Sequence, residues 1–103
     1  MQSWLQGLAC VAAALFLTNG IPHFVKGICG DRFPTPFSKP PGKGLSSPPL
    51  NVAWGIFNFL LGGSLAHLGQ LCCGAPGNRW LATLSAAAFA LFTSWQFAKK
   101  DKE

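Results

Sequence analysis

Charged residues are scarce in this sequence. Only 11% of its 103 residues are Asp, Glu, Lys or Arg, against about 25% in a typical soluble protein. A small domain has more surface per residue than a large one, so a short soluble chain needs many charges to cover itself. The shortage therefore argues against a soluble domain, including one made of three all-round apolar helices, and favours a single membrane domain over 1–103.

Acidic and basic residues are missing altogether from three long stretches, at 1–25, 44–78 and 80–98. Each stretch contains a segment close to the roughly 20 residues that a helix needs to cross about 30 Å of hydrocarbon. The sequence thus predicts an all-α membrane protein whose three transmembrane helices lie at about 3–26, 50–72 and 79–98. A cleaved signal peptide is disfavoured for the first segment, which lacks a basic n-region.

Two very different connections join the predicted helices. The first, over 27–49, holds six of the eight prolines, and proline removes hydrogen-bond donors and fixes φ, so an extended loop without regular structure is expected. Its last residues resemble a helix start, with Ser46 or Ser47 as the cap and prolines in the first turn. The second connection, CGAPGN, is a short turn. It predicts that the second and third helices form a tight antiparallel hairpin.

Basic residues near the helix ends predict the orientation of the chain. The Pro-rich loop together with Lys26, the residue just before it, carries four of them and the tail at 99–103 carries three, whereas the N-terminus has none. The positive-inside rule then places the N-terminus outside and the loop and C-terminus in the cytoplasm of a multi-pass protein. The charges are too few and too close to the helix ends to indicate a nucleic-acid partner. Anionic lipid headgroups of the bilayer are the expected partners of Lys26, Arg32, Lys39 and Lys43.

Small and polar residues recur at helical spacing on the second and third predicted helices. Such stripes allow close approach and hydrogen bonding between helices. The stripe on the second helix consists of Asn51, Gly55, Asn58 and Gly62. The stripe on the third, which could receive it, consists of Ala82, Ala86, Ala90 and Ser94.

Polar residues gather in the cytoplasmic half of the predicted bundle. Counting the helix rise from each midplane puts Asn19 and Asn58 at one depth and His23, Trp54 and Gln96 in a layer nearer the cytoplasm. Pro22 frees a backbone carbonyl beside His23. The amide and imidazole side chains Asn19, His23, Asn58 and Gln96 either hold the helices together or line a small polar pocket open to the cytoplasm, where they would bind a ligand.

Several chemistries find no support in the sequence. His23 and His67 are expected about 20 Å apart along the membrane normal, so no metal site is predicted. No predicted span contains a carboxylate to orient a histidine, and the fragment PGKGLSS has Gly44 where a phosphate-binding loop needs Ser or Thr. The four cysteines show no C-x-x-C spacing. We therefore expect no enzyme, no catalytic residue and no cofactor.

The segments NGIPHFVKGICGDRFPTPF and KPPGKGLSSPPLNVAWGIFN resemble a family of short bacterial membrane proteins of unknown function. The shared features are an N-G-x-P-H-F segment, an F-P-T-P-F loop and an S-S-P-x-x-N-x-x-W-G helix start. The resemblance covers about residues 19–58. It implies a bacterial, inner-membrane location and an ordered Pro-rich loop, and it implies no substrate.

Two functions are expected from these features. The first is association through helix packing, as an accessory subunit of a larger membrane complex or as a homo-oligomer, using the Asn/Gly stripe of the second helix. The alternative is binding or transport of a small polar molecule or lipid headgroup at the cytoplasmic-side pocket of an oligomer.

Overall fold

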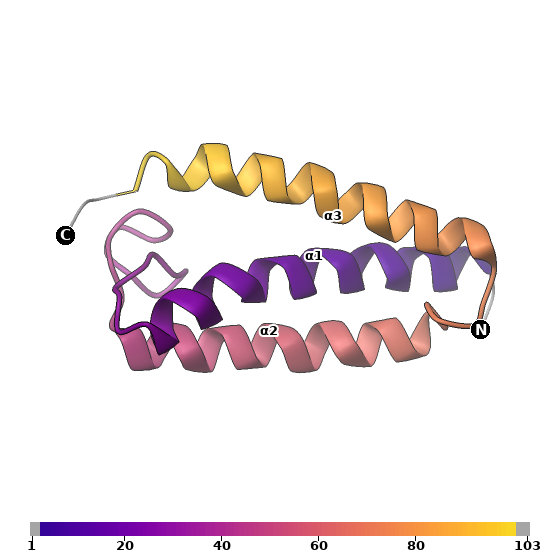
Figure 1. Cartoon of the computed structure of the whole chain (residues 1–103), viewed down its shortest axis with the longest axis horizontal. Coiled ribbons are helices and arrows are strands. Elements are labelled where there is room, and N and C mark those ends of the chain that lie inside the picture. Colours follow the sequence, from indigo (N-terminus) through magenta and orange to yellow (C-terminus); the bar gives the residue numbers. More distant parts are fainter. Residues whose placement is uncertain (1–2, 101–103) are drawn as a thin grey trace.

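A computed structural model describes residues 3–100 of the chain. They form three helices, α1 (Ser3–Ile28), α2 (Pro48–Leu68) and α3 (Pro76–Phe97), as Figure 1 shows. The all-helical fold is therefore confirmed. The only strand-like contact in the described part of the chain is a bridge between Phe33 and Ser46 in the loop that joins α1 to α2.

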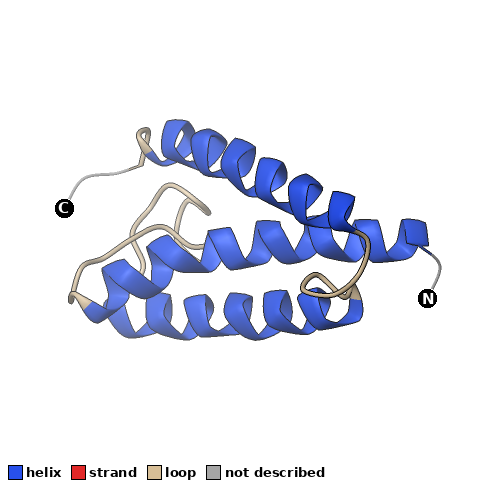
Figure 2. Cartoon of the chain, turned by 45° about the vertical axis from the view of Figure 1, so that its right-hand side comes forward, coloured by secondary structure: helices blue, strands red, loops and turns tan. Residues whose placement is uncertain are grey.

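The order of the helices in space differs from the prediction. α1 lies in the middle, with α2 on one side and α3 on the other (Figures 1 and 2). α2 and α3 run antiparallel but do not contact each other, so the predicted tight hairpin is wrong. Helices that follow each other in sequence are usually neighbours. Here α1 offers small buried residues to both partners, namely Gly20 and Gly27 to α2 and Cys10 and Ala14 to α3.

The start of α2 matches the sequence pattern. Ser47 is the N-cap, its hydroxyl accepts a hydrogen bond from the Leu50 N–H at 3.3 Å, and Pro48 and Pro49 fill the first turn. Proline is tolerated there because those N–H groups have no helical partner. α2 ends at Leu68 and α3 begins at Pro76. The second connection therefore covers 69–75, slightly longer than the 73–78 that lies between the predicted helices.

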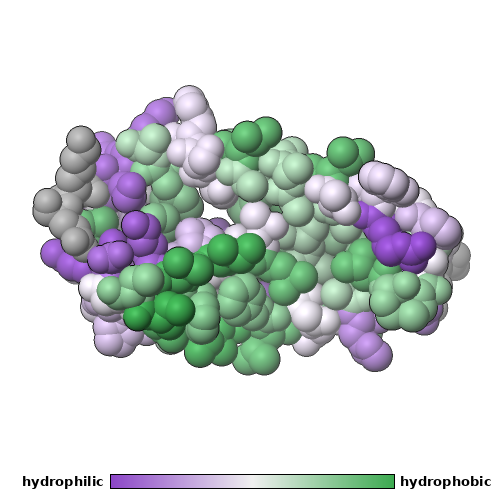
Figure 3. Space-filling view, in the orientation of Figure 1, coloured by the Kyte–Doolittle hydropathy of each residue, from purple (hydrophilic) through white to green (hydrophobic). Residues whose placement is uncertain are grey.

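Two of the three helices meet the requirements of a membrane span. α1 and α2 are long and apolar enough to cross a bilayer by length and composition, and α3 does not reach the same apolarity. Arg79 lies in its first turn and Thr93, Ser94 and Gln96 lie near its end. Figure 3 shows apolar side chains gathered over the middle of the molecule and hydrophilic residues gathered at its two ends.

The Asn/Gly stripe of α2 packs on α1 and not on α3. Asn51, Gly55, Asn58 and Gly62 are all buried. A Cβ added at Gly55 would lie 2.8 Å from the Phe24 backbone nitrogen, so the two backbones meet closely there. The expected pairing of this stripe with that of α3 is therefore wrong, because α1 lies between them.

The small-residue stripe of α3 packs on α1 over part of its length. Ala82 is buried and Ala86 is half-buried against Cys10 and Ala14, whereas Ala90 is exposed. Within this stripe the contact is thus made by the first half, and at the end of α3 Phe97 contacts His23 of α1.

Candidate functional site

The Pro-rich loop is ordered and folds back on itself. Phe33 and Ser46 exchange backbone hydrogen bonds of 3.3 and 3.0 Å. The Thr35 and Ser46 hydroxyls lie 2.7 Å apart, and the Ser38 hydroxyl donates to the Thr35 carbonyl at 2.7 Å. Thr35 is 1% exposed. The loop over 29–47 has no helix or strand, as expected, but the expected extended course is wrong, because hydroxyl side chains supply the donors that the prolines lack.

Asn51 attaches this loop to the helices. Its side-chain nitrogen donates to the carbonyl oxygens of Phe33 at 2.9 Å, Ser46 at 3.2 Å and Ser47 at 3.1 Å. Its side-chain oxygen lies 2.9 Å from Nδ1 of His23. One buried amide thus connects the loop, the start of α2 and the last quarter of α1.

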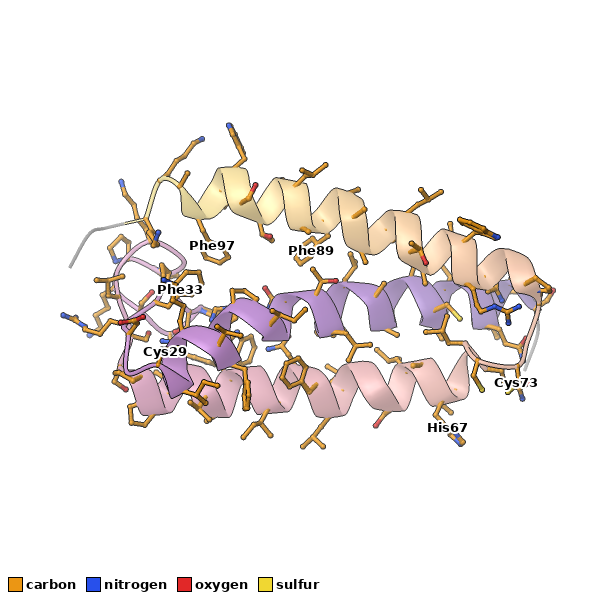
Figure 4. The ribbon with its side chains drawn as sticks, in the orientation of Figure 1. Cys29, Phe33, His67, Cys73, Phe89 and Phe97 are labelled. Atoms are coloured by element: carbon orange, nitrogen blue, oxygen red, sulfur yellow. The ribbon has the colours of Figure 1, made fainter. Side chains whose placement is uncertain are left out.

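His23 lies at the centre of an aromatic cluster and is 2% exposed. Its ring makes edge contacts with Phe33 at 5.3 Å, Phe97 at 6.1 Å and Trp54 at 6.5 Å between centroids. These rings come from the loop, α3 and α2, and Figure 4 shows Phe97 pointing from α3 toward Phe33. Within residues 3–100, Nδ1 is the only nitrogen of the His23 ring that is hydrogen-bonded.

A second polar layer lies one turn deeper. The Asn19 side-chain nitrogen donates to the side-chain oxygen of Asn58 at 3.2 Å, and the Asn58 nitrogen donates to the Trp54 carbonyl at 2.7 Å. Asn58 is 1% exposed. Both the nitrogen and the oxygen of its amide therefore have a partner within the protein, and Asn19 is left with an unpartnered side-chain oxygen.

A cavity of about 320 Å³ opens between the loop and the helices. It falls at the small end of the range for ligand pockets, about 300 to 1,000 Å³. The helices contribute two polar and two aromatic residues to its wall, and the loop contributes the remainder. The lining residues are Asn19, His23, Trp54, Phe97, Pro34, Thr35, Pro36, Pro41 and Gly42.

The structure brings three of the four candidate ligand residues together. Asn19 and His23 line the cavity, and Asn58 lies behind Asn19 and holds it. Gln96 is exposed and outside the wall, where the next residue, Phe97, takes its place. The depth count places Trp54 in the layer of His23, and Trp54 shares the α2 face of Asn51 and Asn58 by helical spacing, but it was not predicted as a ligand residue. No sequence signal pointed to Phe97 or to the loop residues.

The four basic residues expected at lipid headgroups lie outside the cavity. Lys26, Arg32, Lys39 and Lys43 are all exposed at the end of the molecule where the loop lies, and the Arg32 guanidinium is 3.5 Å from the Leu45 carbonyl. Their contact with anionic lipid stays a prediction.

Metal-binding and nucleophilic groups do not cluster in the described residues. No group of three or more His, Cys, Asp or Glu side chains lies together within 3–100, and His67 lies at the opposite end of the molecule from Phe33 (Figure 4). The four cysteines are free. A hydrogen bond with Cys72 raises the pKa of Cys73, and a raised pKa disfavours the reactive thiolate.

Comparisons of this chain with protein-family models, with curated proteins and with solved structures found no match. The fold and the site alone define the class: a three-helix chain in which an ordered Pro-rich loop and all three helices line a polar and aromatic cavity.

Proposed function

We propose that the protein binds a small polar molecule or a lipid headgroup in the cavity beneath the Pro-rich loop. The observation that carries this proposal is His23, which is 2% exposed, lines the cavity, and has one ring nitrogen without a partner in the described chain. That nitrogen is not among the buried unpartnered atoms of residues 3–100, so it is open to the cavity. A ligand in the cavity would supply the missing bond, and the protein would need no catalytic activity to act as a binding module.

We further propose that all three helices lie in a membrane, with the loop and the C-terminus on the cytoplasmic side. The length and apolarity of α1 and α2 support this. α3 packs along α1 and exposes Trp80, Leu84, Leu91 and Trp95, which lipid would cover. The concentration of Lys and Arg at the loop end supports the orientation, and the family resemblance supports a bacterial inner membrane.

Association is a second candidate, as an accessory subunit or a homo-oligomer. The Asn/Gly stripe already packs within the chain, so association would have to use another surface. The observation that favours it is the exposure of large apolar side chains on the outer faces of α2 and α3, such as Leu60 at 67% and Leu91 at 73%.

Native mass spectrometry from mild detergent tests both candidates, because it reports bound small molecules and stoichiometry together. We expect a bound mass in the wild type and in the control Gln96→Leu, and a reduced share of it in Asn19→Leu. Both substitutions replace a carboxamide side chain by leucine, one in the cavity wall and one outside it. A bound mass that Asn19→Leu leaves unchanged, or no bound mass in any of the three proteins, would contradict the proposal.

A further inference from the structure

The hydrogen bonds of Asn51 fix the tautomer of His23. The Asn51 side-chain nitrogen faces three carbonyl oxygens, and the opposite amide orientation would set oxygen against oxygen. Its side-chain oxygen must therefore face Nδ1 of His23 at 2.9 Å, and an oxygen can only accept. Neutral His23 thus carries its proton on Nδ1, and its Nε2 is a hydrogen-bond acceptor.

The same reasoning applies to Asn19. Asn58 donates through its nitrogen to the Trp54 carbonyl at 2.7 Å, so its oxygen is the atom that faces Asn19. Asn19 must present its own nitrogen to that oxygen, which leaves the Asn19 oxygen as a second acceptor. The amide orientations of Asn51 and Asn58 are fixed in the same way: each side-chain nitrogen faces a backbone carbonyl oxygen, which can only accept a hydrogen bond.

Neither acceptor is sealed inside the protein. Across residues 3–100, the buried side-chain nitrogen and oxygen atoms without a partner are Trp54 Nε1 and Asn78 Nδ2 alone. Nε2 of His23 and the oxygen of Asn19 also have no partner, and both residues line the cavity. The cavity therefore offers two accessible lone pairs.

The cavity wall carries no formal charge when His23 is neutral. It contains no Lys, Arg, Asp or Glu. An anion placed there would meet two acceptor atoms and no cation, and a cation would meet no carboxylate. Hydroxyl groups fit best, because each can donate to His23 or Asn19 and its oxygen can also accept.

We infer that the cavity, if it binds a ligand as proposed above, takes an uncharged hydroxyl-bearing molecule that donates hydrogen bonds to Nε2 of His23 and to the side-chain oxygen of Asn19. Two sources carry this chemistry: a soluble polyol such as glycerol, and a lipid whose headgroup ends in a hydroxyl, such as a diacylglycerol.

Nitrogen NMR of labelled histidine tests the inference directly. The variant His67→Asn leaves His23 as the sole histidine of the chain, and its Nε2 resonance should lie in the unprotonated range. Dioleoylglycerol in phosphatidylcholine nanodiscs, or glycerol in solution, should shift that resonance as a hydrogen bond forms. Phosphatidylcholine nanodiscs alone and sulfate, which has no donor, should not. A response to dioleoylglycerol without one to glycerol identifies the lipid source, and the reverse identifies the soluble one.

Paired substitutions at His23 test the role of the acceptor. His23→Asn keeps an amide near the Nδ1 position for Asn51 and removes the Nε2 acceptor, whereas His23→Gln extends its amide toward the Nε2 position. We expect hydroxyl-probe binding to weaken about tenfold in His23→Asn, the loss of one hydrogen bond, and less in His23→Gln. Unchanged hydrogen exchange in the loop over 29–47 verifies that each variant is folded.

The outcomes separate the inference from the proposed function. Binding of sulfate in place of the hydroxyl probes, or a protonated Nε2 in the wild-type tautomer, would overturn the inference and leave a ligand site in place. If no probe binds and no mass co-purifies with the wild type, both the inference and the proposed function are contradicted. Equal binding by His23→Asn and the wild type would also overturn the inference.

Discussion

α1 packs against its two neighbours in different ways. Toward α2 it meets four buried residues, Asn51, Gly55, Asn58 and Gly62, and the backbones approach closely. Toward α3 it meets a single buried residue, Ala82. α1, α2 and the loop therefore pack closely together. α3 packs more loosely on α1, and its last residue, Phe97, contributes to the cavity wall.

The largest expected effect comes from filling the tight interface. In Gly55→Leu the new side chain would start 2.8 Å from the Phe24 backbone nitrogen, so the helices must separate. Gly63 lies on the same helix with nothing within 4 Å of its added Cβ, which makes Gly63→Leu the matched control. We expect Gly55→Leu to lower the free energy of unfolding in mixed micelles by about 3 kcal/mol and Gly63→Leu by far less. Equal losses would contradict the close contact of α1 and α2.

A somewhat smaller effect is expected at the amide that holds the loop. Asn51→Ala removes the partner of three carbonyl groups and of His23 Nδ1, and we expect a loss of about 2 kcal/mol. Hydrogen exchange over 29–47 should accelerate at the same time. Asn78→Ala is the control, because the side-chain nitrogen of Asn78 has no partner in the described residues. Slow exchange in the loop of Asn51→Ala would show that other contacts hold it.

The sequence was sufficient to predict the helices and one buried face, because both depend on local patterns. Gaps in charge located all three helices, and the spacing of Asn51, Gly55, Asn58 and Gly62 identified the buried side of α2. The sequence could not show which helix packs against this buried side of α2. Small residues on α1 and on α3 both offer close contact, and only the complete packing decides between them.

The sequence could predict a residue of the candidate site only where its depth along a helix is enough to place it in the cavity wall. Asn19 and His23 followed from their positions along α1. Gln96 did not, because each helical residue turns by about 100°, so an error of one residue exchanges Gln96 for Phe97. The loop depends on bonds between residues far apart, such as Asn51 to Phe33 and Thr35 to Ser46. Proline content indicated an absence of donors and gave no sign of these bonds.

The smallest predicted effect concerns the loose interface between α1 and α3. Ala82 is 6% exposed and contacts the cluster of Cys10 and Ala14, so Ala82→Leu must displace α3 locally. We expect it to cost about 1 kcal/mol, because α3 can shift outward without disturbing α2. Ala90→Leu, on an exposed position of the same helix, should cost less than about 0.5 kcal/mol. Unfolding titrations in mixed micelles measure both. A loss in Ala82→Leu as large as that in Gly55→Leu would mean that α3 is bound to α1 as firmly as α2 is.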